Sequence, residues 1–265
     1  MAEEFKSRIA FVTGGANGIG YGVAGALLAA GAKVAIGDVS GKALEEAAAK
    51  LNSPNLLSLT LDVTSTASVR EAITECVKKF GGLDTLVNSA GIIEFVPLED
   101  IVEENWLRMI AVDLTGVFYC CQLAAPHLRK SGKGRIVTIS SDAGKIGVAM
   151  LSSYCAAKFG VIGFSKAIAG ELAVDGVTVN CVCPGGVTAT KMGEQVLNWL
   201  SSKTGRTRDE LLIERAKNVP LGRMQTTEDV VGSVMFLISD SANYITGEAI
   251  NIDGGGLGTS RIKGI

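Results

Sequence analysis

Short apolar runs alternate along the chain with segments whose apolar residues recur at helical spacing. The short runs predict strands over residues 9–13, 33–37, 56–61, 85–88, 135–140, 178–182 and 249–252. The helical spacing predicts helices over residues 18–30, 42–51, 67–80, 103–128, 152–174 and 227–238. Because such alternation requires right-handed βαβ crossovers, we predict an α/β fold with a parallel, doubly wound sheet.

The predicted strands are apolar along both faces, as burial between two helix layers requires. The composition agrees, since 47% of the residues are hydrophobic, 20% are charged and 33 are glycines. No internal repeat or linker divides the 265 residues. We therefore expect a single Rossmann domain over residues 1–265, with a seven-stranded parallel sheet flanked by helices.

Residues 190–219 interrupt the alternation between the sixth strand and the last helix. An insertion of this length in a compact domain is typical of a lid or binding element. It follows the carboxyl end of a strand, which is the edge where open α/β sheets bind ligands. We predict a helical substrate-loop insertion; the alternative is a helical excursion on the surface without a role.

Charge and cysteine content exclude several classes of function. The formal net charge is −2 and the basic residues are scattered, so no surface for nucleic acid is expected. Residues 9–32 carry no charge but are punctuated by glycines, which argues against a membrane span. The acidic start does not resemble a secretion signal, so we expect a cytoplasmic protein. The six cysteines lack the spacing of a metal site, so we predict no metal and interpret them as small apolar residues of the core.

A glycine-rich turn, TGGANGIG at residues 13–20, lies between the first strand and the first helix. Its glycines let the backbone approach a pyrophosphate, and the helix presents free N–H groups to the anion. The turn alone is a weak signal, because a tight structural turn can have the same composition. Asp38, at the end of the second strand, strengthens it.

Asp38 predicts which dinucleotide binds. A carboxylate at this place accepts hydrogen bonds from the adenosine ribose and repels a 2′-phosphate. Asn17, in the glycine turn, supplies no positive charge for that phosphate either. Both positions favour NAD over NADP, although an acidic residue at a strand end can also simply cap a turn.

Taken in order, these and further motifs resemble the short-chain dehydrogenase/reductase family from Arg8 to about Gly255. The matching elements are Thr13-Gly14-x-x-x-Gly18-x-Gly20, Asp62-Val63, Asn88-Ser89-Ala90-Gly91, Ser141, Tyr154-x-x-x-Lys158, Pro184-Gly185 and Thr246-Gly247-x-x-x-Asn251-x-Asp253-Gly254-Gly255. The resemblance implies a nicotinamide cofactor. It also implies a homo-oligomer, a dimer or tetramer, in which the helices at 103–128 and 152–174 pair across subunits.

Further roles follow from the resemblance. It implies that Asp62 and Val63 lie near the adenine, and that Asn88, Ala90 and Gly91 lie beside the cofactor ribose. Val187 and a neighbouring threonine would contact the nicotinamide carboxamide. The usual threonine position is Ala189 here, so either Thr188 or Thr190 could take that place.

The chemistry rests on two residues of one helix. Tyr154 and Lys158 are four apart, so they share a helix face and the ammonium can lie near the phenol. We expect Lys158, together with the oxidised nicotinamide, to lower the phenol pKa from its ordinary value. Tyr154 would then exchange a proton with the substrate hydroxyl while Ser141 donates a hydrogen bond to the same oxygen.

Asp113 departs from the family pattern, in which an asparagine is usual. It has nearly the same shape but cannot donate a hydrogen bond as an amide does. Ser89, where a second asparagine is common, is a milder change. We keep Asp113 in the catalytic set, with a shifted pKa as the expected consequence of burying a carboxylate.

The predicted site therefore has two parts. The catalytic residues are Ser141, Tyr154, Lys158 and Asp113. The cofactor-binding residues are Gly14, Asn17, Gly18, Ile19, Gly20, Asp38, Asp62, Val63, Asn88, Ala90, Gly91, Tyr154, Lys158, Pro184, Gly185, Val187, Thr188 and Thr190.

These residues predict an oxidoreductase that transfers a hydride between NAD(H) and a secondary alcohol or ketone. The expected pocket combines residues 92–96 with the insertion, and it mixes apolar side chains with one acid. Its members are Glu94, Phe95, Met150, Met192 and Trp199. This mixture favours a polyol, hydroxyketone or sugar derivative. The alternatives are a reductase of 3-oxoacyl groups or other ketones and, because of Asp113, a catalytically weak NAD-binding sensor or scaffold.

Overall fold

The computed structural model describes residues 5–258, and the strands of this range form one parallel sheet. The strand order is β3-β2-β1-β4-β5-β6-β7, so the chain winds outward in both directions from β1 and β4. The bounds are β1 Ile9–Thr13, β2 Lys33–Asp38, β3 Leu56–Thr60, β4 Thr85–Asn88, β5 Arg135–Ile139, β6 Thr178–Pro184 and β7 Ala249–Ile252. The seven-stranded, doubly wound sheet predicted from the sequence is confirmed. Its order reverses between β1 and β4, where such sheets open a crevice at the carboxyl edge.

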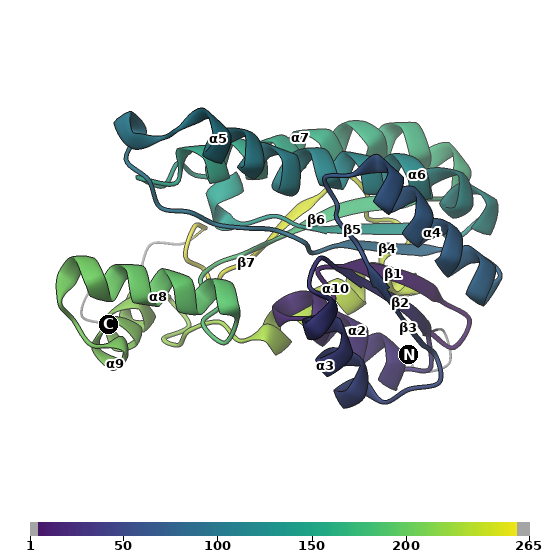
Figure 1. Cartoon of the computed structure of the whole chain (residues 1–265), viewed down its shortest axis with the longest axis horizontal. Coiled ribbons are helices and arrows are strands. Elements are labelled where there is room, and N and C mark those ends of the chain that lie inside the picture. The colour runs from purple at the N-terminus through teal and green to yellow at the C-terminus, as the bar shows by residue number, and fades with distance from the viewer. Residues whose placement is uncertain (1–4, 259–265) are drawn as a thin grey trace.

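Helices cover both faces of the sheet (Figure 1). One layer consists of α2 Gly18–Ala29, α3 Gly41–Leu51 and α10 Thr227–Ile238. The other consists of α4 Thr66–Phe80, α6 Gly116–Ser131 and α7 Ser152–Leu172. The bounds differ from the predicted ones by a few residues, as expected where helix ends fray.

Each face of the sheet contributes to a separate apolar core. Neighbouring residues of β1 show why: Val12 packs in the core beneath α2 and α10, whereas Phe11 packs in the core beneath α4 and α6. Side chains of a strand point alternately to opposite faces, so a strand covered on both faces must be apolar throughout. The six cysteines are unpaired and buried, which agrees with their interpretation as core residues.

The segment predicted as one helix over residues 103–128 is not uniform. It consists of α5 Glu103–Ile110, a π-helical turn η2 Ala111–Thr115, and α6. A π-turn inserts an extra residue into the helix and is frequent at functional sites. Here it contains Asp113, which is fully buried. The continuous run Glu103–Ser131 is long and apolar enough to cross a membrane by length and composition, but its buried side chains belong to the core against β4 and β5.

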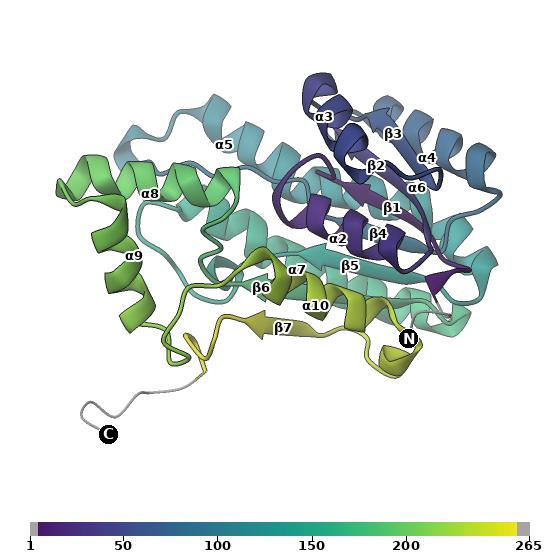
Figure 2. The same cartoon turned by 90° about the horizontal axis from the view of Figure 1, so that it is seen from below.

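The insertion after β6 is helical, as predicted. It comprises α8 Lys191–Thr204 and α9 Arg208–Lys217. Polar side chains fix both starts: Thr190 accepts a hydrogen bond from Gly193 N, and Thr207 forms a capping box with Glu210. Figure 2 shows the two helices beyond the ends of β6 and β7, at the carboxyl edge of the sheet.

Candidate active site

The four predicted catalytic residues come together at the carboxyl edge of the sheet. Ser141 follows β5, and Tyr154 and Lys158 lie one turn apart on α7. The Lys158 Nζ atom is 5.5 Å from the centroid of the Tyr154 ring. Asp113 reaches the group from the π-turn, with its Oδ2 atom 3.2 Å from Lys158 Nζ. The cluster therefore joins a phenol, an ammonium, a carboxylate and a hydroxyl.

Lys158 and Asp113 are held by main-chain groups as well as by each other. Lys158 Nζ donates a hydrogen bond to the Ile139 carbonyl at 3.1 Å, and Asp113 Oδ1 accepts one from Ile92 N at 2.8 Å. Ser140, behind the catalytic serine, donates from its hydroxyl to the Lys158 carbonyl at 3.1 Å. The position of the ammonium is thus fixed from β5, the π-turn and its own helix.

Burial dominates the electrostatics of this cluster. It raises the pKa of the Tyr154 phenol; Lys158 lowers that pKa, and Asp113 raises it further. The net direction is upward, so the lowered pKa predicted from the sequence is wrong for the chain by itself. The reason is that the carboxylate partly offsets the ammonium while the phenol loses contact with water.

The buried pair itself holds two opposite charges. Burial lowers the pKa of the Lys158 ammonium, but Asp113 and Tyr154 raise it and the net shift is upward. Burial raises the pKa of the Asp113 carboxyl, and Lys158 and Ile92 N oppose that rise. The 3.2 Å contact favours the carboxylate and ammonium forms together, because each is the other's counter-charge.

Ser141 is oriented by the turn that follows β5. Its hydroxyl donates to Asp142 Oδ1 at 2.9 Å and accepts from Ala143 N at 3.1 Å. The Ser141 side chain also acts to lower the pKa of the Tyr154 phenol. A hydroxyl between a carboxylate and a phenol can turn its proton toward a substrate oxygen.

The glycine turn connects β1 to α2 at the carboxyl edge of the sheet, and its glycines present main chain without side chains there. Gly14 and Gly18 have φ values of +62° and +55°, which favour glycine. A Cβ atom at Gly14 would lie 2.8 Å from the main chain of Ala90, so the turn packs tightly against the end of β4. The Thr13 hydroxyl joins the same two segments by accepting from Ser89 N and Ala90 N at 3.1 and 3.2 Å. This cradle and the N-terminus of α2 fit the pyrophosphate of a dinucleotide.

The two acidic residues predicted to face the adenosine lie at the ends of the neighbouring strands β2 and β3. Asp38 is half-buried at the end of β2 and accepts hydrogen bonds from Ala16 N at 3.4 Å and Ser40 N at 3.1 Å. Asp62 is exposed and accepts from the main chain and hydroxyl of Thr64. Asp38 therefore links the glycine turn to the second strand, where a ribose would lie.

The other predicted cofactor residues line the same edge. Asn88 is buried, and its amide donates to Thr138 Oγ1 at 3.1 Å, while its Oδ1 atom has no hydrogen-bond partner within residues 5–258. Thr190 lies opposite the glycine turn: its methyl carbon would be 3.3 Å from a Cβ at Gly18. The start of α2 therefore lies beside the segment that leads from β6 to the insertion.

The insertion contacts the loop of residues 92–96, which is the other part of the predicted substrate pocket. Trp199 of α8 stacks on Phe95, with ring centroids 4.2 Å apart. Met150 has a φ of +66°, uncommon outside glycine, and its carbonyl accepts from Val96 N at 2.9 Å. Glu94 is already engaged, because it accepts from Asn105 at 3.0 Å and pairs with Arg108 at 3.2 Å.

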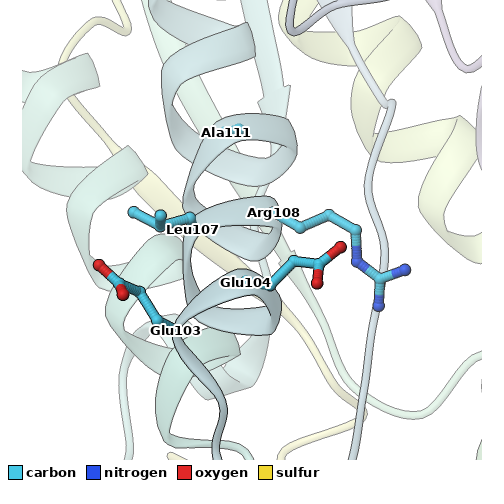
Figure 3. Close-up of a pocket in the computed structure, with 5 residues that line it drawn as sticks. All are labelled: Glu103, Glu104, Leu107, Arg108 and Ala111. Carbon is cyan, nitrogen blue, oxygen red and sulfur yellow. The ribbon is translucent and has the colours of Figure 1, made fainter.

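A surface hollow on α5 does not belong to this site. It is lined by Glu103, Glu104, Leu107, Arg108 and Ala111. Figure 3 shows Glu104 and Arg108 on one side of the helix and Glu103 and Leu107 on the other, so these side chains do not converge on a common point. The chemistry is therefore assigned to the carboxyl edge and not to this hollow.

Comparisons with known proteins agree with the geometry. Residues 14–256 match the family described as enoyl-(acyl carrier protein) reductase. The chain is 37% identical to 2-(S)-hydroxypropyl-CoM dehydrogenase 3 of Xanthobacter autotrophicus, over 96% of this chain and 98% of the relative. It is 38% identical to L-2,3-butanediol dehydrogenase of Corynebacterium glutamicum, over 94% and 98%. A crystal structure of an actinorhodin polyketide ketoreductase variant with NADPH has a TM-score of 0.91 and 33% identity, over 96% of this chain and 99% of that one.

The fold and the cluster define an oxidoreductase of the dinucleotide-binding type. More specifically, the chain belongs to the short-chain dehydrogenase/reductase family, whose members named above act on CH–OH groups or on the corresponding ketones.

Sequence reasoning missed the main-chain groups that hold the cluster, at Ile92 and Ile139, since a carbonyl or N–H leaves no trace in residue type. It also missed Arg215 of α9, whose guanidinium lies against Gly186 at the end of β6. Arg215 lies in a charged segment whose pattern predicts a solvent-exposed helix face. Nothing in that pattern indicates that part of the Arg215 side chain is buried.

Proposed function

We propose that this protein is an NAD-dependent dehydrogenase of secondary alcohols that also reduces the corresponding ketones. The observation that carries the proposal is the buried contact of Tyr154 with Lys158 beside Ser141, on the edge that holds the glycine cradle. When bound, the nicotinamide supplies the hydride acceptor or donor. The residues of the chain then supply positioning and proton transfer.

In this mechanism Ser141 donates a hydrogen bond to the substrate oxygen and Tyr154 exchanges the proton. In the oxidation direction the phenolate takes the hydroxyl proton, and in the reduction direction the phenol returns it to the carbonyl oxygen. Lys158 stabilises the phenolate through its charge. The positive charge of the oxidised cofactor supports the same ionisation, which the chain alone does not favour.

Asp38 supports NAD rather than NADP. Its carboxylate lies at the end of β2, bound to Ala16 N and Ser40 N, where a 2′-phosphate would meet a negative charge. The related ketoreductase was solved with NADPH, so family membership alone does not decide the cofactor. Exchange of Asp38 for serine is expected to improve the use of NADP relative to NAD.

A small polar alcohol, such as a polyol, hydroxyketone or sugar derivative, is the proposed substrate class. The relatives named for butanediol and hydroxypropyl-CoM support it. The matched family description and the related ketoreductase keep a reductase of 3-oxoacyl groups or other ketones as the second candidate. We further propose that the enzyme is a homo-oligomer, because the apolar side chains of Trp106 on α5 and Phe159 on α7 are exposed. A cytoplasmic location stays a prediction.

The test is a panel of secondary alcohols, offered with NAD and separately with NADP, while the absorbance of the reduced nicotinamide is followed. We expect turnover with NAD on at least one diol, polyol or hydroxy acid. Tight binding of NAD without turnover on any alcohol or ketone would contradict the proposal and favour a cofactor-binding sensor.

A further inference from the structure

Arg215 is a half-buried cation that forms no ion pair in the part of the chain that the structure describes. It lies near the end of α9, and its Nε atom is buried and has no hydrogen-bond partner within residues 5–258. No carboxylate of that range pairs with it, whereas Arg206 pairs with Glu214 on the same insertion. A guanidinium that has lost part of its water without gaining a partner is unfavourable unless something else satisfies it.

The guanidinium lies at the edge of the sheet that carries the chemistry. Gly186 is the second residue after β6, and a Cβ atom there would be 2.5 Å from Arg215 Nη2. A side chain at position 186 would require the guanidinium to shift, whereas glycine leaves room for it where it lies. The next residue, Val187, is buried and belongs to the predicted cofactor site.

The insertion brings Arg215 over the substrate side of the crevice. Helices α8 and α9 pack against each other, and Trp199 of α8 reaches across to stack on Phe95. Figures 1 and 2 both show α8 and α9 beyond the ends of β6 and β7. Asp38, which marks the adenosine side, lies on β2 in the other half of the sheet.

The chemistry of the guanidinium limits what it can bind. It is always protonated, and its planar donors match the oxygens of a carboxylate, sulfonate or phosphate. We propose that Arg215 forms an anion-binding subsite next to Gly186, and that the substrate is a secondary alcohol or ketone that also carries such an anionic group. This inference rests on the proposed function and narrows its substrate class.

Two carboxylates near this subsite have other partners. Glu214, next to Arg215 in the sequence, pairs with Arg206, and Asp253, beside Gly185, accepts hydrogen bonds from Gly255 N and Leu257 N. The charge of Arg215 is therefore available to a ligand that enters the crevice.

The experiment compares matched pairs of substrates. The probes are 3-hydroxybutyrate, 4-hydroxypentanoate and 5-hydroxyhexanoate, each with its methyl ester. Within a pair, the ester lacks the negative charge of the acid. Along the series, the distance between the carboxylate and the alcohol increases. The variants are Arg215→Gln and, as a matched control, Arg208→Gln, which changes an exposed arginine of the same helix.

We expect the wild-type protein to prefer at least one acid over its ester. Arg215→Gln should lower kcat/KM for that acid by about 10- to 100-fold, the range of a hydrogen bond to a charged group. It should leave kcat/KM for the ester unchanged, and Arg215→Lys should restore part of the loss. Arg208→Gln should leave both unchanged. In a measurement without turnover, 4-oxopentanoate should raise the melting temperature of the NAD-bound wild type but not of NAD-bound Arg215→Gln.

Three results would overturn the subsite. The guanidinium would not bind the anionic group if the wild type had equal kcat/KM values for the esters and the acids. The same conclusion would follow if Arg215→Gln lowered kcat/KM equally for acid and ester. A loss of NAD affinity in that variant, with the acid preference intact, would assign Arg215 to a cofactor phosphate instead. Each of these leaves the dehydrogenase assignment standing, whereas absence of turnover on every acid, ester and neutral diol would remove the proposed function itself.

Discussion

Two buried ionic clusters lie at opposite edges of the same sheet, and they differ in how completely the oxygens of their buried carboxylates, Asp84 and Asp113, are matched. At the amino edge, Asp84 accepts from Ile9 N at 3.0 Å and Thr85 Oγ1 at 2.7 Å, and Arg8 lies 3.7 Å from it. Arg8 also pairs with Asp240 at 2.9 Å. Each carboxylate oxygen of Asp84 thus has a hydrogen-bond donor, although burial still raises its pKa.

At the carboxyl edge the matching is incomplete. Asp113 Oδ1 accepts a hydrogen bond from Ile92 N, whereas Oδ2 has, among residues 5–258, the ionic contact to Lys158 but no aligned hydrogen bond. The phenol of Tyr154, in the same cluster, is buried with its pKa raised. A buried carboxylate whose two oxygens both accept hydrogen bonds is typical of a structural role, whereas a buried acid with an unmatched oxygen beside a phenol of shifted pKa is typical of a functional site. The two edges of this sheet illustrate that difference.

The largest expected effect comes from removing the cation at the carboxyl edge. Lys158→Met deletes the charge that lowers the pKa of Tyr154 and leaves Asp113 without its counter-charge. We expect alcohol oxidation to fall by about 10²- to 10⁴-fold, the range of an acid/base contribution. Steady-state kinetics measure it, and Lys166→Met, a substitution of an exposed lysine on the same helix, serves as the control.

Removal of the buried carboxylate at the amino edge, Asp84, should change the free energy of unfolding and leave catalysis unchanged. Asp84→Ala leaves Ile9 N and the Thr85 hydroxyl without their acceptor, at about 1–3 kcal/mol each, while Arg8 keeps Asp240 as a counter-charge. Denaturant unfolding measures the free energy of unfolding, and kcat at low temperature is expected to stay at the wild-type value. A large loss of kcat in the folded variant would erase the distinction between the two edges.

An intermediate effect is expected from Asp113→Asn, which removes a negative charge while keeping the shape and the acceptor for Ile92 N. Since Asp113 raises the pKa of Tyr154, its neutralisation should lower that pKa. The base form then persists to lower pH, so the acidic limb of kcat/KM for oxidation should move to lower pH. On that limb we expect a gain of about three- to tenfold. A limb at its original place would show that the carboxylate is only a packing group.

The smallest expected effect concerns the contact between the insertion and the loop before α5. Phe95→Ala removes the stack on Trp199, a contact worth about 0.5–1.5 kcal/mol, so KM should rise by roughly two- to tenfold with kcat little changed. Phe236→Ala, on the exposed face of α10, is the control. If KM stays constant, the stack does not shape the pocket.

Much of the fold follows from the sequence because it depends on periodicity. The strands of a parallel sheet covered on both faces are continuous apolar runs, and β5, buried in every residue, stands out clearly. The π-turn at Ala111–Thr115 could not be read in the same way. Its apolar spacing differs from that of an α-helix by a single residue, and only the structure shows that Asp113 of this turn contacts Lys158.

The site was predictable where side chains carry the chemistry. Tyr154 and Lys158 share a helix face by spacing alone, and Ser141 follows a strand end. The direction of the phenol pKa was not predictable, because it depends on how deeply Tyr154 is buried and on the charge of a residue from another helix. The role of Arg215 was not predictable for the same reason, because the burial of its Nε atom and its position beside Gly186 depend on tertiary packing.

Replacement of Tyr154 by Phe tests the central claim most directly, because it removes one hydroxyl and keeps the ring that packs in the core. Single-turnover oxidation of the best alcohol by the NAD-bound variant should be slower by about 10²-fold or more, while NAD binds with its original affinity. Oxidation by Tyr154→Phe at the wild-type rate would contradict the assignment of the phenol as the acid/base.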